Sequence, residues 1–434
     1  MKISAEFARN AGRNRERGVT MILIAVGLSF MILAMAALAI DLVALYSAHN
    51  DARLAADAAA LAGAKAIANS GYTTDQGTIP WATIQPIAAA LATTVATQNK
   101  IAGQPILAGN VTVNIPAPAN PTNPQVSVTV KATGVPAFFS RIWGNTALPV
   151  AATSNAEAYN PGYPSNNLPV QPQCVKPWLL PNLGLDGNSN IFNPATGTPN
   201  LTDNQLGIPY PLTPTCAGPG GCSGQPTVSP TAAHYLPASL DAPTTVPACA
   251  PDSCSYEQNI AACSPQPISC SSSTSLQQVS IDATNCGAIN YTNTGTECLI
   301  RASGSGMGLG QDCMGADGPG SCSSAAPIVV TQMFAGANNR LISNGINVGD
   351  LISTSDSLVT IPVFNYVTGQ PPIPTASPVN IIGFVQAFVT SVNSSTGAIT
   401  IRIVNIAGCS DNVAGSPPVQ GDSISPVPVH LISN

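Results

Sequence analysis

The feature that most limits the possible folds is an apolar run that continues, without a turn, into an alanine-dense segment. Residues 19–40, VTMILIAVGLSFMILAMAALAI, contain no charged residue. As an α-helix this run is about 33 Å long, which matches a bilayer core of about 30 Å. The first proline of the chain is Pro80, and Gly63 is the only glycine between Asp41 and Ser70. Because alanine has the highest helix propensity, we predict one unbroken helix from the membrane to residue 69.

The charges beside the run predict its orientation. Asp41 closes the run. Five basic residues precede it, namely Lys2, Arg9, Arg13, Arg15 and Arg17. The positive-inside rule then puts the N-terminus in the cytoplasm and residues 41–434 outside. The alternative is a signal peptide cleaved after Ala37–Ala39, so that the chain begins at Ile40. The length of the run and the helix-forming sequence beyond it favour a retained anchor.

The segment 41–69 is predicted to pack against the exterior part of the protein. A helical spacing puts four side chains on one face, namely Leu54, Ala58, Leu61 and Ala62. Asp51 and Asp57 lie off that face. Small side chains allow a neighbouring helix or sheet to approach closely. Asn69-Ser70-Gly71 is expected to end the helix. The alternative interpretation is an alanine-rich spacer next to the membrane.

The composition of the exterior part favours strands and long loops. Charged residues are only 8% of the chain, and it contains 40 prolines and 37 glycines. The net charge is −6, and the only basic cluster adjoins the apolar run. Phosphate recognition needs concentrated positive charge, so a nucleic-acid partner is excluded.

All cysteines lie between Cys174 and Cys409, in an even number that is typical of disulfides formed in an oxidising compartment. The alternative is a set of free thiols in the cytosol. Four close pairs could close small loops, namely 216/222, 249/254, 263/270 and 313/322, but spacing alone does not determine the pairing. The disulfide candidates are Cys174, Cys216, Cys222, Cys249, Cys254, Cys263, Cys270, Cys286, Cys298, Cys313, Cys322 and Cys409.

Local patterns outside the first helix predict an α+β fold. A second helix is expected over 79–99, with Pro86 breaking or starting it, and a short helix over 136–144 whose aromatic residues form core. Residues 111–115, 125–132 and 148–159 alternate with period two and predict strands. Further strands are expected at 327–334, 357–367, 379–392 and 398–408. The turn NSSTG links the last two in a hairpin.

The expected organisation has six parts. A transmembrane helix continues as an alanine-rich, pilin-like stalk helix, which packs on a β-sheet domain with a disulfide-rich loop insertion. One sheet domain built from 70–160 and 327–434 is the simplest architecture; two separate domains are the alternative. The parts are 1–18 (cytoplasmic basic tail), 19–40 (transmembrane helix), 41–69 (stalk helix), 70–160 (α+β part), 161–326 (Cys/Pro/Gly-rich insertion) and 327–434 (β-rich part).

The N-terminal residues resemble a known family. The stretch RGVTMILIAVGLSFMILAMAALAIDLVALYSAHNDARLAADAAALAGAKA is similar to the N-terminal module of TadE/TadG-like proteins of the Tad (Flp) tight-adherence pilus assembly system. VPAFFSRIWGNTALPVAATSNAEAYNP resembles the TadG-like branch. The motif residues are Arg17, Gly18, Asp41, Tyr46, Ala56, Asp57, Ala58, Ala59, Ala60, Leu61, Ala62, Gly63 and Ala64.

This resemblance implies a non-enzymatic structural or assembly component of a Tad pilus. It implies a single-pass protein of the bacterial cytoplasmic (inner) membrane, with the bulk of the chain periplasmic or extracellular. The expected partners are membrane lipid and pilin-like or pilus-assembly proteins. The alternative is a membrane-anchored surface adhesin or ligand-binding protein that uses a pilin-like anchor, with an unidentified surface ligand.

No residue pattern predicts catalysis, a cofactor or a metal site. TadG-like proteins often carry an Asp-x-Ser-x-Ser metal motif, but the nearest strings, DSCSY (252–256) and DSLVT (356–360), do not match it. DGNSN (186–190) lacks the later carboxylate of a calcium loop and is expected to be a plain turn. GSGMGLG (304–310) has no following Lys, which argues against a phosphate loop. The three histidines, His49, His234 and His430, are too scattered for a triad or a zinc site.

Overall fold

A computed structural model describes the backbone of most of the chain. Side chains are described from Val19 onward, apart from those of Asn344 and Gln420. The described residues are 3–74, 79–120, 123–136, 139, 147–162, 168, 170–184, 186–187, 189–201, 205–216, 222–250, 254–269, 277–284, 289–302, 310–315, 332–375, 377–409, 419–420 and 425–433.

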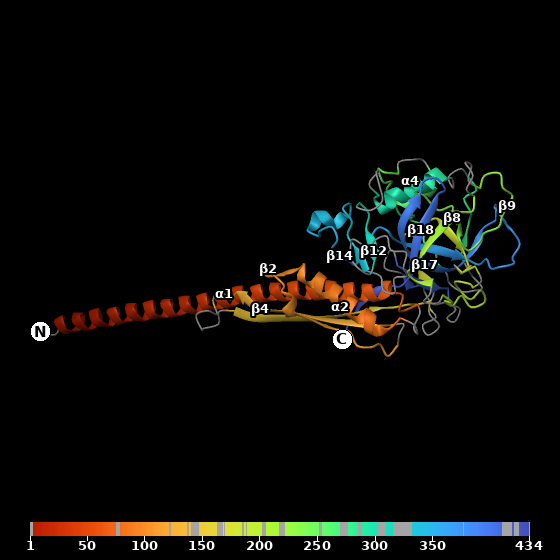
Figure 1. Cartoon of the computed structure of the whole chain (residues 1–434). Helices are drawn as coiled ribbons and strands as arrows, with labels where there is room; N and C mark the ends of the chain where they lie inside the picture. Colours follow the sequence, from red (N-terminus) through yellow and green to blue (C-terminus); the bar gives the residue numbers. More distant parts are fainter. Residues whose placement is uncertain are drawn as a thin grey trace. The chain divides into compact units, whose positions relative to one another are not determined.

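The chain forms two compact units, and helix α1 belongs to both. Unit 1 consists of Met1–Ala56, Ala96–Thr112 and Thr129–Thr153. Unit 2 consists of Asp57–Val95, Val113–Val128 and Ser154–Asn434. α1 (Ile3–Asn69) is a single helix of 67 residues (Figure 1). The predicted unbroken helix is therefore confirmed, and it ends at the expected Asn69-Ser70-Gly71 because Gly71 adopts a left-handed φ of 78°.

Unit 1 contains the first part of α1, short elements after α2 and parts of two long strands. Its short elements are β1 (Lys100–Ile101), β2 (Gln104–Pro105) and the 3₁₀ helix η1 (Ala108–Asn110). Within this unit, Thr129 Oγ1 and Thr153 Oγ1 lie 2.8 Å apart and form a hydrogen bond between neighbouring strands.

Helix α2 (Trp81–Thr97) lies within the range predicted for the second helix. Pro86 lies inside this helix rather than at its start, so the helix lacks the backbone hydrogen bond that residue 86 would donate. The Gln85 side chain donates to the Ile115 carbonyl at 3.0 Å and so ties α2 to the chain beyond β3.

A four-stranded sheet has the order β20-β5-β4-β3. β20 pairs antiparallel with the end of β5, which brings the last described strand of the chain beside residues 155–158. The predicted strands over 111–115, 125–132 and 148–159 are confirmed. The strands are β3 (Val111–Asn114), β4 (Gln125–Pro136), β5 (Ala147–Ala158) and β20 (Val429–Ile432).

The main core of unit 2 is a closed barrel of six strands. Its strands follow the order β17-β15-β7-β10-β8-β18, and β18 pairs back onto β17, while the short β11 (Gln278–Val279) lies outside β17 (Figure 1). The barrel strands are β7 (Trp178–Pro181), β8 (Pro209–Pro214), β10 (His234–Pro237), β15 (Leu358–Phe364), β17 (Val379–Asn393) and β18 (Ala398–Gly408).

The barrel corrects one part of the expected architecture. The Cys/Pro/Gly-rich residues 161–326 do not form only a loop insertion, because three of the six barrel strands, β7, β8 and β10, come from them. These strands are short and contain proline, so no alternating apolar pattern reveals them. They become strands through long-range pairing: β8 pairs with β18 of the C-terminal hairpin, β7 pairs with β15, and β10 pairs with both β7 and β8.

The hairpin of β17 and β18 follows the prediction closely. Asn393 pairs with Ala398, and Gly397 in the connecting turn has a φ of 65°. The register shifts twice: Val404 of β18 is the extra residue opposite Gln386 and Ala387, and Thr390 of β17 is the extra residue between Val389 and Ser391, so each strand carries one β-bulge. β15 is buried along its whole length and β17 along most of its length, which explains their lack of alternation.

Smaller elements surround the barrel in unit 2. α3 (Ser255–Ala261) and α4 (Ile289–Ile300) are helices, and η5 (Arg340–Asn344) is a 3₁₀ helix. The remaining strands pair in small sheets: β12 (Cys313–Gly315) with β13 (Gln332–Phe334) and β14 (Leu351–Ile352), β9 (Thr227–Val228) with β16 (Ile373–Pro374), and β6 (Val170–Gln171) with β19 (Val419–Gln420).

Three disulfides join described cysteines, and all lie in unit 2. The bond Cys216–Cys222 is one of the predicted close pairs. The pairs 249/254 and 263/270 are wrong, because Cys249 bonds to Cys298 and Cys263 bonds to Cys174. Folding brings α4 to the 249 segment, so distance along the chain does not determine these partners. Cys254, Cys313 and Cys409 are also disulfide-bonded, whereas positions 270, 286 and 322 lie outside the described residues.

The helix predicted over 136–144 falls largely outside the described residues. Pro136 is the last residue of β4, and Phe139 lies in a bend and is half-buried. The glycine-rich string 304–310 also falls outside them, apart from Gly310.

Candidate membrane and assembly helix

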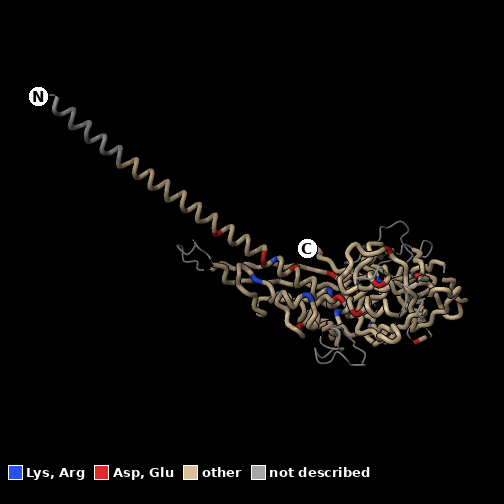
Figure 2. Tube along the Cα trace, turned by 90° about the horizontal axis from the view of Figure 1, so that it is seen from above, with Lys and Arg blue, Asp and Glu red and all other residues tan. Residues whose placement is uncertain are grey.

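The first described part of α1 exposes apolar side chains on all sides. Seventeen large hydrophobic residues between Val19 and Tyr46 are exposed, from 48% for Val26 to 75% for Met21. A helix in the core of a soluble protein would bury at least one apolar stripe, but only 6% of the most apolar stretch of α1 is buried. Figure 2 shows this uncharged stretch as an uninterrupted tan tube. In the described part of the chain, α1 is the one helix long and apolar enough to cross a membrane.

Asp41 lies where the environment of α1 changes from exposed to packed. Its side chain is buried, and its two carboxylate oxygens accept the Phe139 backbone N–H at 3.2 and 3.1 Å. Three turns on, Asp51 Oδ2 accepts the Ala102 N–H at 3.1 Å. Both contacts lie within unit 1. A buried carboxylate needs such donors, so Asp41 is held by folded protein near the start of the packed part of α1.

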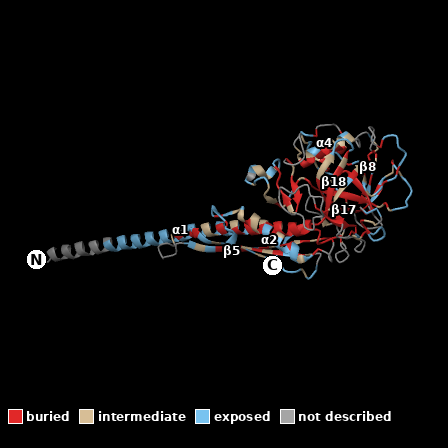
Figure 3. Ribbon diagram, in the orientation of Figure 1, coloured by how far each residue is buried: buried red, intermediate tan, exposed pale blue. Residues whose placement is uncertain are grey.

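Between Asp41 and Gly63 the buried face of α1 consists of alanine. Figure 3 shows the change along the helix from pale blue to red. The expected face is wrong in part, since Leu54 is 67% exposed and Ala58 and Leu61 are only half-buried. The smallest side chains face inward because they permit the closest approach of neighbouring backbone. The fully buried residues before Gly63 are Ala48, Ala52, Ala55, Ala56, Ala59 and Ala60.

Gly63 marks the tightest packing on this face. A Cβ added there would lie 2.9 Å from Val126 Cγ1 in β4 and 3.3 Å from Ala92 Cβ in α2. No side chain larger than hydrogen fits without movement of these neighbours. Within unit 2, α1 is therefore held between a strand and a second helix.

The last turn of α1 is bonded to the barrel. The last four carbonyls of a helix lack intrahelical donors. One of them, the Ala68 carbonyl, accepts a hydrogen bond of 2.9 Å from Asn405 Nδ2 of β18. Just beyond the helix, the Ile406 N–H donates to Thr74 Oγ1 at 3.1 Å. Asn160 Nδ2 donates to the carbonyls of Thr73 and Ile406 at 3.0 and 3.2 Å. All of these groups are buried, so β18 and the end of α1 move together.

The structure brings most of the predicted motif residues onto the packed part of one helix. Asp41 is buried, whereas Tyr46 is 68% exposed and lies on the opposite side from the alanine face. Asp57, Ala58 and Leu61 are half-buried, and the other members from Ala56 to Ala64 are buried. Arg17 and Gly18 belong to α1, but they precede the residues whose burial is described.

The sequence analysis missed the polar residues that fasten α1 to the barrel. Asn405 and Gln386 have no exposed surface, and both lie in strands that are otherwise mostly apolar. Asn405 Nδ2 also donates to Gln386 Oε1, which accepts Ser425 Oγ at 3.0 Å as well. An amide inside an apolar strand is the signal that could have identified them, because such a group needs a buried partner.

The other candidate sites behave as turns or structural pairs. Asp186 Oδ1 accepts the Ser189 N–H at 3.0 Å and its Oγ at 2.8 Å, which closes an Asx-type turn. Asp356, in the string compared with a metal motif, pairs with two arginines instead. Among the described residues, no group of three or more His, Cys, Asp or Glu is placed to hold a metal ion.

These observations define a class of protein in which one long helix serves two purposes. Its first part, apolar and exposed, fits a membrane anchor, and its other end is packed into a folded domain. A comparison with family models adds the family. Residues 18–66 match the model described as "Putative Flp pilus-assembly TadE/G-like". The chain therefore carries a TadE/G-like domain of the Tad pilus family over α1, which confirms the resemblance inferred from the motif residues. No curated protein and no solved structure shows a significant match.

Proposed function

We propose that the protein is a membrane-anchored, non-enzymatic structural component of a Tad (Flp) pilus assembly. Residues 19–40 of α1 would cross the cytoplasmic membrane once, with the N-terminus in the cytoplasm and the folded part outside. The observation that carries this proposal is the change at Asp41 from exposed apolar surface to a packed alanine face. The family match over residues 18–66 supports it, because the description of that family names Flp pilus assembly.

The proposed function depends on a firm link between anchor and exterior domain. α1 is one helix, so no hinge separates its apolar part from its packed part. The bonds from Asn405 and Thr74 attach its end to the barrel. A force or a partner acting on the membrane end of α1 would thus be transmitted to the barrel, as an assembly component requires.

The exposed side of α1 beyond Asp41 is the proposed contact with pilin-like or pilus-assembly partners. Leu42, Val43 and Tyr46 are more than 60% exposed there, on the side of the helix away from the alanine face. Exposed apolar side chains at this density usually mark an interaction surface. Among the described residues of unit 1, the folded part leaves these three side chains exposed.

Photocrosslinking in cells that assemble the pilus tests this function. A photoreactive residue at Tyr46 or Leu54 should form adducts with pilin-like or assembly proteins. Val348, which is 56% exposed in unit 2, is the matched control and should form none. Adducts at Val348 without any at Tyr46 or Leu54 would contradict the assembly role and favour the alternative, a surface-binding protein.

A further inference from the structure

A cavity of about 420 Å³ in unit 2 lies where two helices end. The last residues of α3 and α4 line it, together with the start of β15 and of η5. Two smaller cavities, of about 370 and 250 Å³, share part of this lining. Its size falls within the range of small-molecule sites. Its lining combines the charged residues Lys176, Arg301, Arg340 and Asp356 with the apolar residues Leu299, Leu358 and Val359.

Two arginines at this cavity share a single carboxylate oxygen. Arg301 Nε lies 2.7 Å and Arg340 Nε 3.2 Å from the same Asp356 Oδ2. Arg301 also donates from Nη1 to the Asn338 carbonyl at 3.4 Å. In the described part of the chain, the terminal nitrogens of Arg340 have no acceptor, and the side chain is 72% exposed. Two positive charges therefore face one negative charge, with guanidinium donors left for an oxyanion.

Two residues with left-handed backbone conformation line this cavity. Arg301 has a φ of 55° and occupies the position after α4 where glycine is strongly favoured. Its N–H bonds to Cys298 O, and the Ala302 N–H bonds to Glu297 O at 3.1 Å, which completes the helix-ending motif. Among the described residues, three non-glycine residues have positive φ, and two of them, Cys174 and Arg301, line this cavity. Strain of this kind gathers at functional sites.

Lys176 stabilises the wall of the cavity and does not contribute a donor to it. Its Nζ donates to three carbonyls at the end of α3: Asn259 at 3.5 Å, Ile260 at 2.8 Å and Ala262 at 2.5 Å. The side chain is 2% exposed, and all three of its N–H groups have acceptors. The disulfides Cys174–Cys263 and Cys249–Cys298 fix the same wall on both sides. The site is thus held in place before any ligand arrives.

We propose that this cavity binds a small organic anion. Its carboxylate or phosphate group would contact Arg301 and Arg340, and its apolar part would lie against Leu299, Leu358 and Val359. Asp356 holds the two guanidinium groups in place and competes with the anion for them. This site is independent of the proposed assembly role, since α1 takes no part in it.

Calorimetric titration of the full chain in detergent micelles tests the site. The probes are inorganic phosphate, sulfate and pentanoate, each at constant ionic strength with chloride as the reference anion. Arg340→Gln should weaken binding about tenfold or more, because a charge-assisted contact is lost at an exposed position that folding does not need. Asp356→Asn should strengthen binding, because the competing carboxylate is removed.

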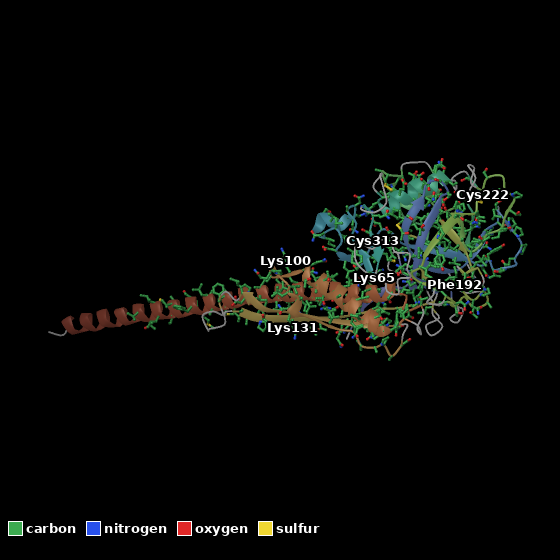
Figure 4. The ribbon with its side chains drawn as sticks, viewed as in Figure 1. Lys65, Lys100, Lys131, Phe192, Cys222 and Cys313 are labelled. Carbon is green, nitrogen blue, oxygen red and sulfur yellow. A yellow bond between two sulfur atoms is a disulfide. The ribbon has the colours of Figure 1, made fainter. Side chains whose placement is uncertain are left out.

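The control variant is Lys131→Gln, which removes an exposed positive charge in unit 1 and should leave binding unchanged (Lys131 is labelled in Figure 4). Tighter binding of pentanoate would identify a carboxylate with an apolar tail as the ligand class, and tighter binding of phosphate a phosphorylated one. The proposal is overturned if no probe binds at millimolar concentration, or if Arg340→Gln binds them as well as the unaltered chain. Weaker anion binding by Arg340→Gln together with stronger anion binding by Asp356→Asn would exclude a purely structural role for this ion pair.

Discussion

Asn405 in β18 donates a 2.9 Å hydrogen bond to the carbonyl of Ala68, next to the last residue of α1. The two residues are 337 positions apart in the sequence. The bond satisfies a helix-end carbonyl that has no donor within the helix. Because both residues are fully buried, this contact ties the helix to the barrel.

Asn405→Ala is expected to loosen the end of α1. The variant leaves the Ala68 carbonyl buried without its donor, which costs about 1–3 kcal/mol. Amide hydrogen exchange over residues 60–69 should accelerate, while exchange in α4 stays unchanged. Asn114→Ala, at an exposed position of β3, serves as the control. Equal protection in all three proteins would show that the barrel does not hold the helix.

Gly63→Val is expected to destabilise the packing of α1 on β4 and α2. The new side chain would collide with Val126 and Ala92, and overpacking of this kind costs about 1–3 kcal/mol. Denaturant unfolding in detergent measures the loss. Gly27→Val is the matched control, since nothing lies within 4 Å of a Cβ at Gly27. If both variants unfold at the same denaturant concentration, the close approach at Gly63 is not real.

Lys176 makes the stability of unit 2 depend on pH. Burial lowers the pKa of Lys176 to about 7, against an opposing effect of the Asp356 charge. In the unfolded chain a lysine keeps its proton up to about pH 10.4. Between these two values the unfolded chain binds one more proton, so raising the pH above about 7 increases the free energy of unfolding.

The measurement is the free energy of unfolding from pH 7 to 9, compared with that of Lys176→Met. The difference between the two proteins should change with a slope of up to about 1.4 kcal/mol per pH unit, in favour of the unaltered chain as pH rises. Lys131→Met, at an exposed site, should follow the unaltered chain. A difference that is constant or that shrinks with rising pH would refute the lowered pKa.

The disulfides should differ in their effect on stability according to the length of chain they close. Cys174–Cys263 spans 89 residues and Cys216–Cys222 spans 6. The loop-entropy model gives about 4–5 kcal/mol for the long loop and about 2 kcal/mol for the short one. Paired Cys→Ser variants in urea unfolding should therefore rank 174/263 as the more costly. The reverse ranking would mean that local packing outweighs chain entropy here.

Local patterns predicted the elements that depend on neighbouring residues. The long helix, its stop at Gly71 and the hairpin at Gly397 all follow from propensity and turn chemistry within a few residues. Which face of α1 is buried was only partly predictable, because alanine occurs on all sides of this helix and so does not mark the buried side. Leu54 therefore looked like core although it lies outside.

Long-range pairing explains what the sequence did not reveal. β8 and β10 run parallel to each other and are four to six residues long, so their pairing depends on the barrel and not on their own pattern. The partner of Cys249 is set by the position of α4. Lys176 and Arg301, the only basic residues between positions 160 and 326, were visible in the sequence, but only the fold brings both to one cavity.

The most direct test of the account is thiol labelling in proteoliposomes with the folded part outside. An impermeant maleimide should modify Leu54→Cys at once and Leu28→Cys only after detergent is added. Both side chains are exposed in the protein itself, 67% and 60% respectively, so any protection at position 28 comes from lipid. Equal labelling of the two positions without detergent would contradict the claim that α1 is anchored in the membrane and continues as one helix into the folded domain.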